Sequence, residues 1–68
     1  MSRYDYEQSK QIAKDSPPFY AIIMAAAREA DTFNLERLEA VFPETVAELR
    51  LRYNAPGGIL HEGEGLHE

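Results

Sequence analysis

The residues with the clearest potential for chemistry lie at the C-terminal end of the chain. The side chains there that can ligate a metal ion are His61, Glu62, Glu64, His67 and Glu68. The two histidines are six residues apart, whereas the helical zinc-protease motif needs two histidines four apart with a glutamate between them. Glycines at 63 and 65 also work against the fixed backbone that a ligand set requires. We therefore predict no metal site and no cofactor.

Catalysis by a side-chain nucleophile or by paired acids finds little support. The chain has no cysteine, and none of Ser2, Ser9 and Ser16 has a histidine near it in the sequence. Carboxylate pairs such as Glu36 with Glu39 lie one helical turn apart, a spacing typical of solvated charge on a helix face. Acid–base catalysis would need a cleft that moves two pKa values apart, and none is predicted. We expect a protein that is not an enzyme, has no catalytic residue and takes no small-molecule substrate.

The balance of charge argues against direct binding to nucleic acid. Twelve acidic side chains face seven basic ones, for a net charge of −5, whereas binding to DNA depends on Lys and Arg neutralising phosphates. Short helices joined by tight turns can form a helix-turn-helix, but its recognition helix presents basic or amide side chains near its N-terminus. The last predicted helix begins instead with Pro43, Glu44 and Thr45.

A chain of 68 residues allows one small domain, which we place at residues 1–60, followed by a flexible acidic tail over 61–68. Such a chain buries only about 60% of its unfolded surface, and it has no disulfide to add stability, so a protein partner or a homo-oligomer is expected. Its longest apolar run, residues 19–27, is about half a membrane span. With no membrane segment or secretory signal predicted, we expect a cytoplasmic protein.

Prolines and glycines divide the chain into four helical segments. The first runs from about Arg3 to Lys14 with Ser2 as its N-cap, and carries only a thin apolar stripe. The second is predicted to begin with Ser16 as N-cap and Pro17 as its first helical residue. Because the segment 19–30 is apolar around most of its circumference, we expect it to be the central helix.

The remaining two helices meet at Pro43. The third begins at Asp31, Thr32 or Asn34, any of which can cap it, and ends before Pro43. The fourth begins at Pro43 and stops at Asn54 in a left-handed conformation. Glu48 and Arg52, four residues apart on this helix, are spaced to form a surface ion pair. The predicted fold is all-α, a compact orthogonal bundle of three to four short helices with an extended C-terminal tail.

Aromatic side chains supply the candidate interaction surface. The three phenylalanines, at 19, 33 and 42, fall on predicted core stripes. The tyrosines have an apolar body and a polar tip, which suits either a core edge or an interface, and those at 4, 6 and 20 are candidates for one exposed patch. The candidate partner-binding residues, tyrosines with an acidic rim, are Tyr4, Tyr6, Tyr20, Glu36, Glu39 and Tyr53.

Four short motifs carry a family resemblance. They are FYAxIMAA at residues 19–26, DxxNxExL at 31–38, FPE at 42–44 and RYNAPGG at 52–58. The order and content of these motifs resemble a group of small proteins of bacteriophages and prophages. The resemblance implies an origin in a phage or another mobile element, and a host-cell interior as the place of action. It implies no activity.

Two functions remain as hypotheses. In the first, a non-enzymatic phage or mobile-element protein binds a host or phage protein as an inhibitor or regulator. In the second, the chain is a structural or assembly accessory, such as a minor virion or packaging component, that self-associates.

The charge argument makes a direct prediction. Duplex DNA mixed with micromolar protein at low salt should show no shift in fluorescence anisotropy, because a net charge of −5 leaves little attraction for phosphates. Clear binding that weakens as salt is added would contradict the prediction.

Overall fold

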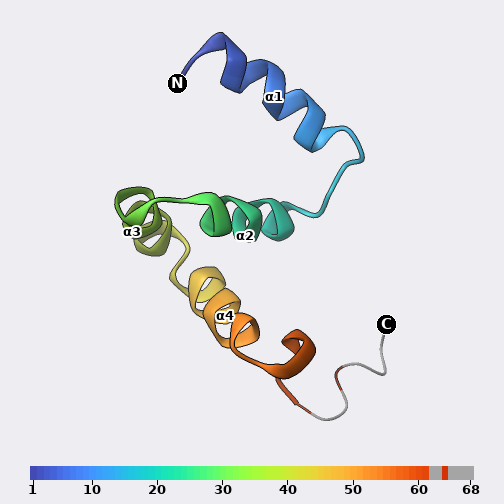
Figure 1. Ribbon diagram of the computed structural model, residues 1–68, viewed down its shortest axis with the longest axis vertical. Coiled ribbons are helices and arrows are strands. Elements are labelled where there is room, and N and C mark those ends of the chain that lie inside the picture. Colours follow the sequence, from blue (N-terminus) through green and yellow to red (C-terminus); the bar gives the residue numbers. More distant parts are fainter. Residues whose placement is uncertain (62–63, 65–68) are drawn as a thin grey trace.

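The described part of the chain, residues 1–61 and 64 of a computed structural model, is helical with no strand (Figure 1). Its elements are α1 (Arg3–Ala13), α2 (Phe19–Glu29), α3 (Thr32–Val41), α4 (Pro43–Tyr53) and the short 3-10 turn η1 (Pro56–Gly58). The predicted all-α fold of short helices is confirmed. The flexible tail predicted over 61–68 falls mostly on 62–63 and 65–68, which lie outside the described residues.

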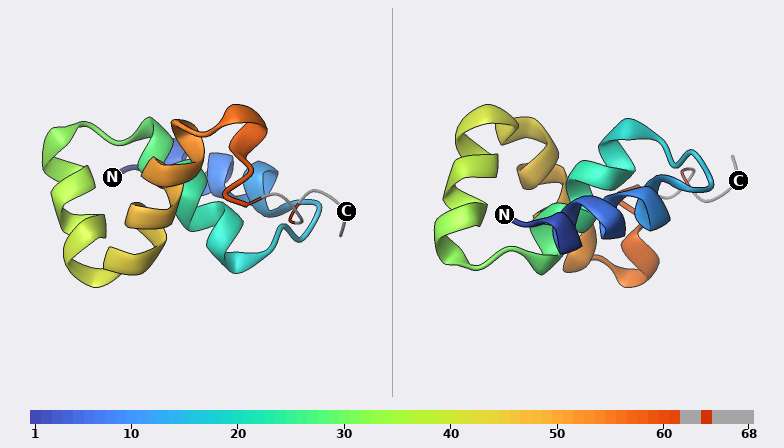
Figure 2. Two further views of the ribbon diagram at one scale, coloured as in Figure 1. Left: turned by 90° about the horizontal axis from the view of Figure 1, so that it is seen from below. Right: turned by 90° about the horizontal axis from the view of Figure 1, so that it is seen from above.

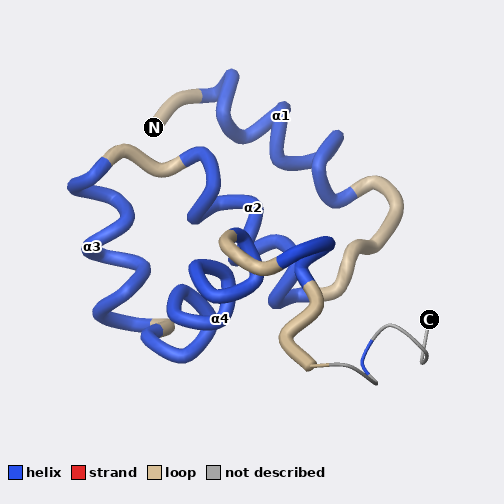
Figure 3. Tube along the Cα trace, turned by 60° about the horizontal axis from the view of Figure 1, so that its bottom comes forward, coloured by secondary structure: helices blue, strands red, loops and turns tan. Residues whose placement is uncertain are grey.

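Helix α4 forms the centre of the bundle. It packs against α2, α3 and η1, and it supplies Val46, which is 1% exposed, and Leu49, which is also buried. The third buried residue of the described chain is Ala27 of α2. The prediction that the helix at 19–30 is central is therefore wrong. The apolar circumference of α2 would allow other helices to pack on most of its sides. In the structure α3 and α4 pack against it and α1 does not, so much of that circumference stays exposed (Figure 3).

Two of the phenylalanines predicted for the core lie at its edge. Phe19 and Phe33 are both more than half exposed. Phe19 packs its ring against that of Phe42, with centroids 6.0 Å apart, and the Arg37 guanidinium covers the Phe33 ring at 4.2 Å. Only Phe42 is partly buried, as expected of a core residue.

Helix α1 stands apart from the bundle that α2, α3 and α4 form. It lies beyond α2, on the side away from α4 (Figure 1, Figure 2), and within the described chain no other helix packs against it. The radius of gyration is 14.0 Å, against about 11 Å for a compact chain of this length. An isolated helix of this size is marginal in water, so α1 needs a surface to pack on.

A single residue joins α3 to α4, as the Phe42-Pro43 sequence predicted. The Phe42 N–H donates to the carbonyl of Leu38 at 2.6 Å and ends α3, while the Val46 N–H donates to the Phe42 carbonyl at 3.1 Å and begins α4. Pro43 is the first residue of α4, where its missing N–H costs no hydrogen bond. This tight joint forces the two helices to cross close to Val46.

The predicted caps are right for two helices and wrong for one. The Ser2 hydroxyl accepts from the Asp5 N–H at 3.2 Å, and the Asp31 carboxylate accepts from the Asn34 N–H at 2.8 Å. Helix α2, however, begins at Phe19 with Pro18 as its N-cap, not after Ser16. A residue that precedes proline is driven out of the helical region, so Pro18 prevents a helical start at residue 17. Ser16 instead takes a positive φ of 50°.

The end of α4 also differs from the prediction. Asn54 is not left-handed, since its φ is −94° and its ψ is 0°. Its side-chain amide instead donates to the Arg50 carbonyl at 2.9 Å. The left-handed conformation is taken further on by Gly57 and Gly58, with φ of 61° and 70°, and these two glycines turn the chain back toward α4.

The position of the core can be tested with two leucines of one helix. Leu49→Ala should lower the free energy of unfolding by about 2–5 kcal/mol, because it removes a buried side chain and leaves a cavity. The matched control is Leu51→Ala, since Leu51 is 62% exposed, and it should change stability by less than about 0.5 kcal/mol. Urea denaturation followed by circular dichroism measures both. Equal losses would show that α4 is not the packed centre.

Candidate functional site

A groove of about 460 Å³ opens between α2, α3 and α4. We call it the core groove, because its floor is the interior of the bundle itself. The floor contains the three buried residues of the described chain and Leu35. The floor and rim together are Ala27, Arg28, Glu29, Leu35, Val46, Leu49, Arg50, Tyr53 and Asn54. Because these floor residues are buried or half-buried, the exposed part of the groove is its rim.

The rim of the core groove carries two arginines, each held by a neighbour. The Arg28 guanidinium lies over the Tyr53 ring, 5.5 Å from its centroid, a cation–π contact between α2 and the end of α4. Arg50 forms an ion pair with Glu39 across the α3–α4 crossing. The rim also carries Glu29, and Arg50 is already paired with Glu39, so the charges around the groove largely balance.

A second groove, of about 600 Å³, lies where the start of α2 meets the α3–α4 joint. We call it the corner groove. Its lining residues are Tyr20, Met24, Val41, Phe42, Pro43, Glu44, Thr45 and Glu48. Tyr20 is 59% and Val41 70% exposed, and the two glutamates give one side of the groove an acidic edge. Of the two glutamates, Glu48 is paired with Arg52.

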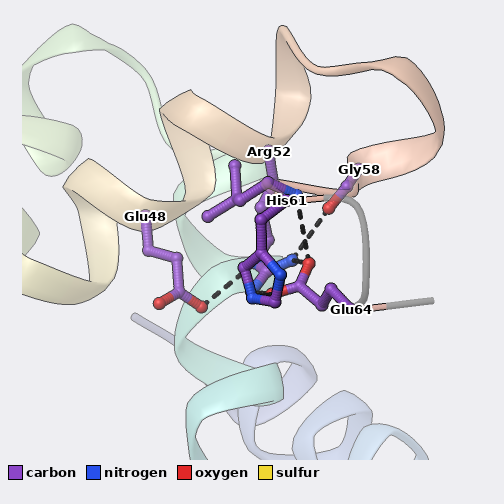
Figure 4. Close-up of polar contacts among 6 residues, drawn as sticks. Glu48, Arg52, Gly58, His61 and Glu64 are labelled. Carbon is purple, nitrogen blue, oxygen red and sulfur yellow. Dashed lines mark hydrogen bonds and ion pairs between the residues drawn. The ribbon is translucent and has the colours of Figure 1, made fainter. Parts of the chain in front are cut away.

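The most connected polar side chain is Arg52 of α4 (Figure 4). Its guanidinium donates to the Gly58 carbonyl at 2.8 Å and binds the Glu64 carboxylate through both terminal nitrogens, one of them at 2.8 Å. Its Nε donates to Glu48 at 3.2 Å, which confirms the predicted Glu48–Arg52 ion pair. The Glu64 contact was not predicted, because it depends on the reversal of the chain at the two glycines.

The same contacts shift the ionisation of both partners. Hydrogen bonds from Arg52 and from the Leu60 N–H lower the pKa of Glu64 to about 2. The hydrogen bonds to Glu64 and Glu48 in turn raise the pKa of Arg52. With its donors engaged, Arg52 anchors the segment after α4 to that helix. These contacts hold the chain in place. Of the side chains in them, Glu48 lines the corner groove, while Arg52 and Glu64 line neither groove.

The candidate residues from the sequence fall into four places. Tyr53 lines the core groove and Glu39 holds one of its rim arginines, so these two share a site. Tyr20 lines the corner groove, and Glu36 is exposed on α3. Tyr4 and Tyr6 are exposed near the start of α1.

The structure does not bring the three N-terminal tyrosines into one patch. Helices α1 and α2 run in opposite directions (Figure 1). Tyr4 and Tyr6 lie in the first turns of α1 and Tyr20 in the first turn of α2, so they sit at opposite ends of the pair. Arg28 and Arg50 of the core groove were missed, because they come from different helices and share no sequence motif.

No protein-family model, curated protein or solved structure matches the chain. Among residues 1–61 and 64, no helix is long and apolar enough to cross a membrane. The same residues contain no group of three His, Asp or Glu side chains placed to hold a metal ion. Of the five candidate metal-ligand residues noted in the sequence, the structure describes His61 and Glu64. The absence of a metal site and of catalytic residues stays a prediction.

The Arg52–Glu64 contact predicts a response to acid. Because the pKa of Glu64 is depressed in the folded chain, the contact contributes at pH values above the ordinary 4.5 and is lost as the pH falls toward 2. A carbon-13 NMR titration of the Glu64 carboxyl should therefore have its midpoint near 2 in the native chain. In Arg52→Gln the midpoint should rise toward 4.5, because the largest cause of the depression is removed. A native midpoint near 4.5 would show that Glu64 is not docked.

Proposed function

We propose that this chain is a small non-enzymatic protein of a phage or mobile element that binds a host or phage protein as an inhibitor or regulator. One observation carries the proposal: many large apolar side chains are exposed, while three residues of the described chain are buried. The exposed ones are Met1, Tyr4, Tyr6, Ile12, Phe19, Tyr20, Phe33, Val41, Leu51, Tyr53, Ile59 and Leu60. A contiguous exposed apolar patch marks an interaction site, and three of these side chains, Tyr20, Val41 and Tyr53, line the two grooves.

The core groove is the part of this surface best suited to a partner protein. Its floor is already formed by the packed residues Leu35, Val46 and Leu49, so a partner's apolar side chain would complete the core without rearrangement of the bundle. Its rim adds an aromatic side chain and two arginines, and aromatic and Arg residues dominate binding energy at protein interfaces. We propose that the partner places an apolar or aromatic side chain against Tyr53 and Arg28 at this rim.

A self-associating assembly accessory is the second candidate. The observation that favours it is α1, an 11-residue helix with no packing partner among the described helices. A second copy of the chain is one source of the surface that α1 needs.

The first candidate predicts a specific capture. Immobilised protein should recover one dominant protein from a lysate of infected cells, and Arg28→Glu combined with Tyr53→Ala should lower the recovery at least about tenfold. Both side chains lie on the rim, and Tyr53 is 71% exposed, so circular dichroism of the variant should match the native chain.

Leu51→Ala is the control for this experiment. Leu51 is exposed on the same helix but does not line the core groove, so recovery should be unchanged. An empty capture with the native bait, or equal recovery by all three baits, would count against the proposed site.

A further inference from the structure

Tyr53, the aromatic residue on the rim of the core groove, is the last residue of α4. Its side chain is largely exposed, and the Arg28 guanidinium lies over its ring at 5.5 Å. The last carbonyl groups of a helix lack partners within the helix, and helix ends open at little cost in free energy. Contacts made by other residues must therefore hold the last turn of α4, and with it Tyr53, in place.

Backbone hydrogen bonds close the end of α4 locally. The Asn54 N–H donates to the Arg50 carbonyl at 3.3 Å, and the Ala55 N–H donates to the Arg52 carbonyl at 3.1 Å. The Gly58 N–H then donates to the Ala55 carbonyl at 3.0 Å and closes η1. Each of these bonds joins near neighbours in the sequence, so the end of the helix can unwind one bond at a time.

The side chain of Arg52 adds contacts of longer range to the same turn (Figure 4). Its guanidinium donates to the Gly58 carbonyl at 2.8 Å and binds the Glu64 carboxylate through both terminal nitrogens, one of them at 2.8 Å. The same carboxylate accepts the Leu60 N–H at 3.1 Å. We call these contacts the Arg52 clasp.

The Arg52 clasp depends on the helical conformation of the last turn of α4. Arg52 directly precedes Tyr53, so unwinding of this turn would displace the guanidinium and break its bonds to Gly58 and Glu64 together. Bidentate bonds between charged groups are roughly twice as strong as bonds between neutral groups. Arg52 and Glu64 are also less exposed than the partners of the Arg50–Glu39 pair, so salt screens their attraction less. The clasp therefore opposes the unwinding that would move Tyr53.

We propose that the Arg52 clasp positions Tyr53 at the rim of the core groove, so that docking of Glu64 on α4 controls how well the groove binds its partner. Arg52 and Glu64 line neither groove, so they are positioning residues that act through the last turn of α4. The control of binding rests on the proposed function of the core groove, whereas the order of Tyr53 can be measured without any partner.

Removal of the Glu64 carboxylate tests the clasp in the full chain. In Glu64→Ala, the backbone order parameters of Tyr53 and Asn54 from nitrogen-15 NMR relaxation should fall from about 0.85 to below about 0.6, because the turn is then free to open. Those of Val46 and Leu49, which are buried in the core, should stay at about 0.85 and show that the bundle is still folded.

Glu7→Ala is the matched control for this substitution. It removes the same charge and also breaks an ion pair, that of Glu7 with Lys10 on α1, so the order of Tyr53 should be unchanged. Arg52→Gln should lower the order of Tyr53 at least as much as Glu64→Ala. The double variant should match Arg52→Gln, because the Glu64 substitution then has no contact with Arg52 left to break.

The capture experiment measures the effect on the partner. A Glu64→Ala bait should recover at least about threefold less of the captured protein than the native bait, and a Glu7→Ala bait should recover the same amount. Unchanged order of Tyr53 in Glu64→Ala would overturn the proposal, and so would equal capture by the native and Glu64→Ala baits. An empty capture with the native bait would instead count against the core groove as a partner site, while a fall in the order of Tyr53 would still support the clasp.

Discussion

The crossing of α3 and α4 at Phe42 is the constraint on which the rest of the structure depends. Because one residue separates the helices, the end of α3 and the start of α4 are held together, and Val46 is enclosed one turn beyond the joint. Helix α2 then packs across α4 and adds Ala27 to the same core. Both grooves flank this crossing, the corner groove at the joint and the core groove along the far part of α4.

So small a core leaves apolar surface that the chain cannot bury by itself. The two grooves hold part of this surface, with Tyr53 at the core groove and Tyr20 and Val41 at the corner groove. Several charges beside the grooves are already paired within the chain, Arg50 with Glu39 and Glu48 with Arg52. The apolar and aromatic side chains are therefore the part of each groove that is left for a partner to cover.

The segment after α4 is held by electrostatics more than by apolar packing. Gly57 and Gly58 turn the chain back, and Arg52 then binds both the Gly58 carbonyl and the Glu64 carboxylate. Ile59, just past the turn, remains 42% exposed. A bidentate arginine–carboxylate pair of this kind is stronger than an ordinary surface ion pair, which allows a polar segment to dock without a core of its own.

Local signals in the sequence determined which segments are helical and where most of them end. The caps at Ser2 and Asp31, the joint at Pro43 and the Glu48–Arg52 pair all act within four residues, so the sequence alone predicts them. Only the tertiary structure decided that α4 and not α2 is central, that the described helices leave α1 uncovered, and that Arg52 reaches Glu64. The angle at each joint decides which apolar faces meet, and no local pattern of residue types contains that angle.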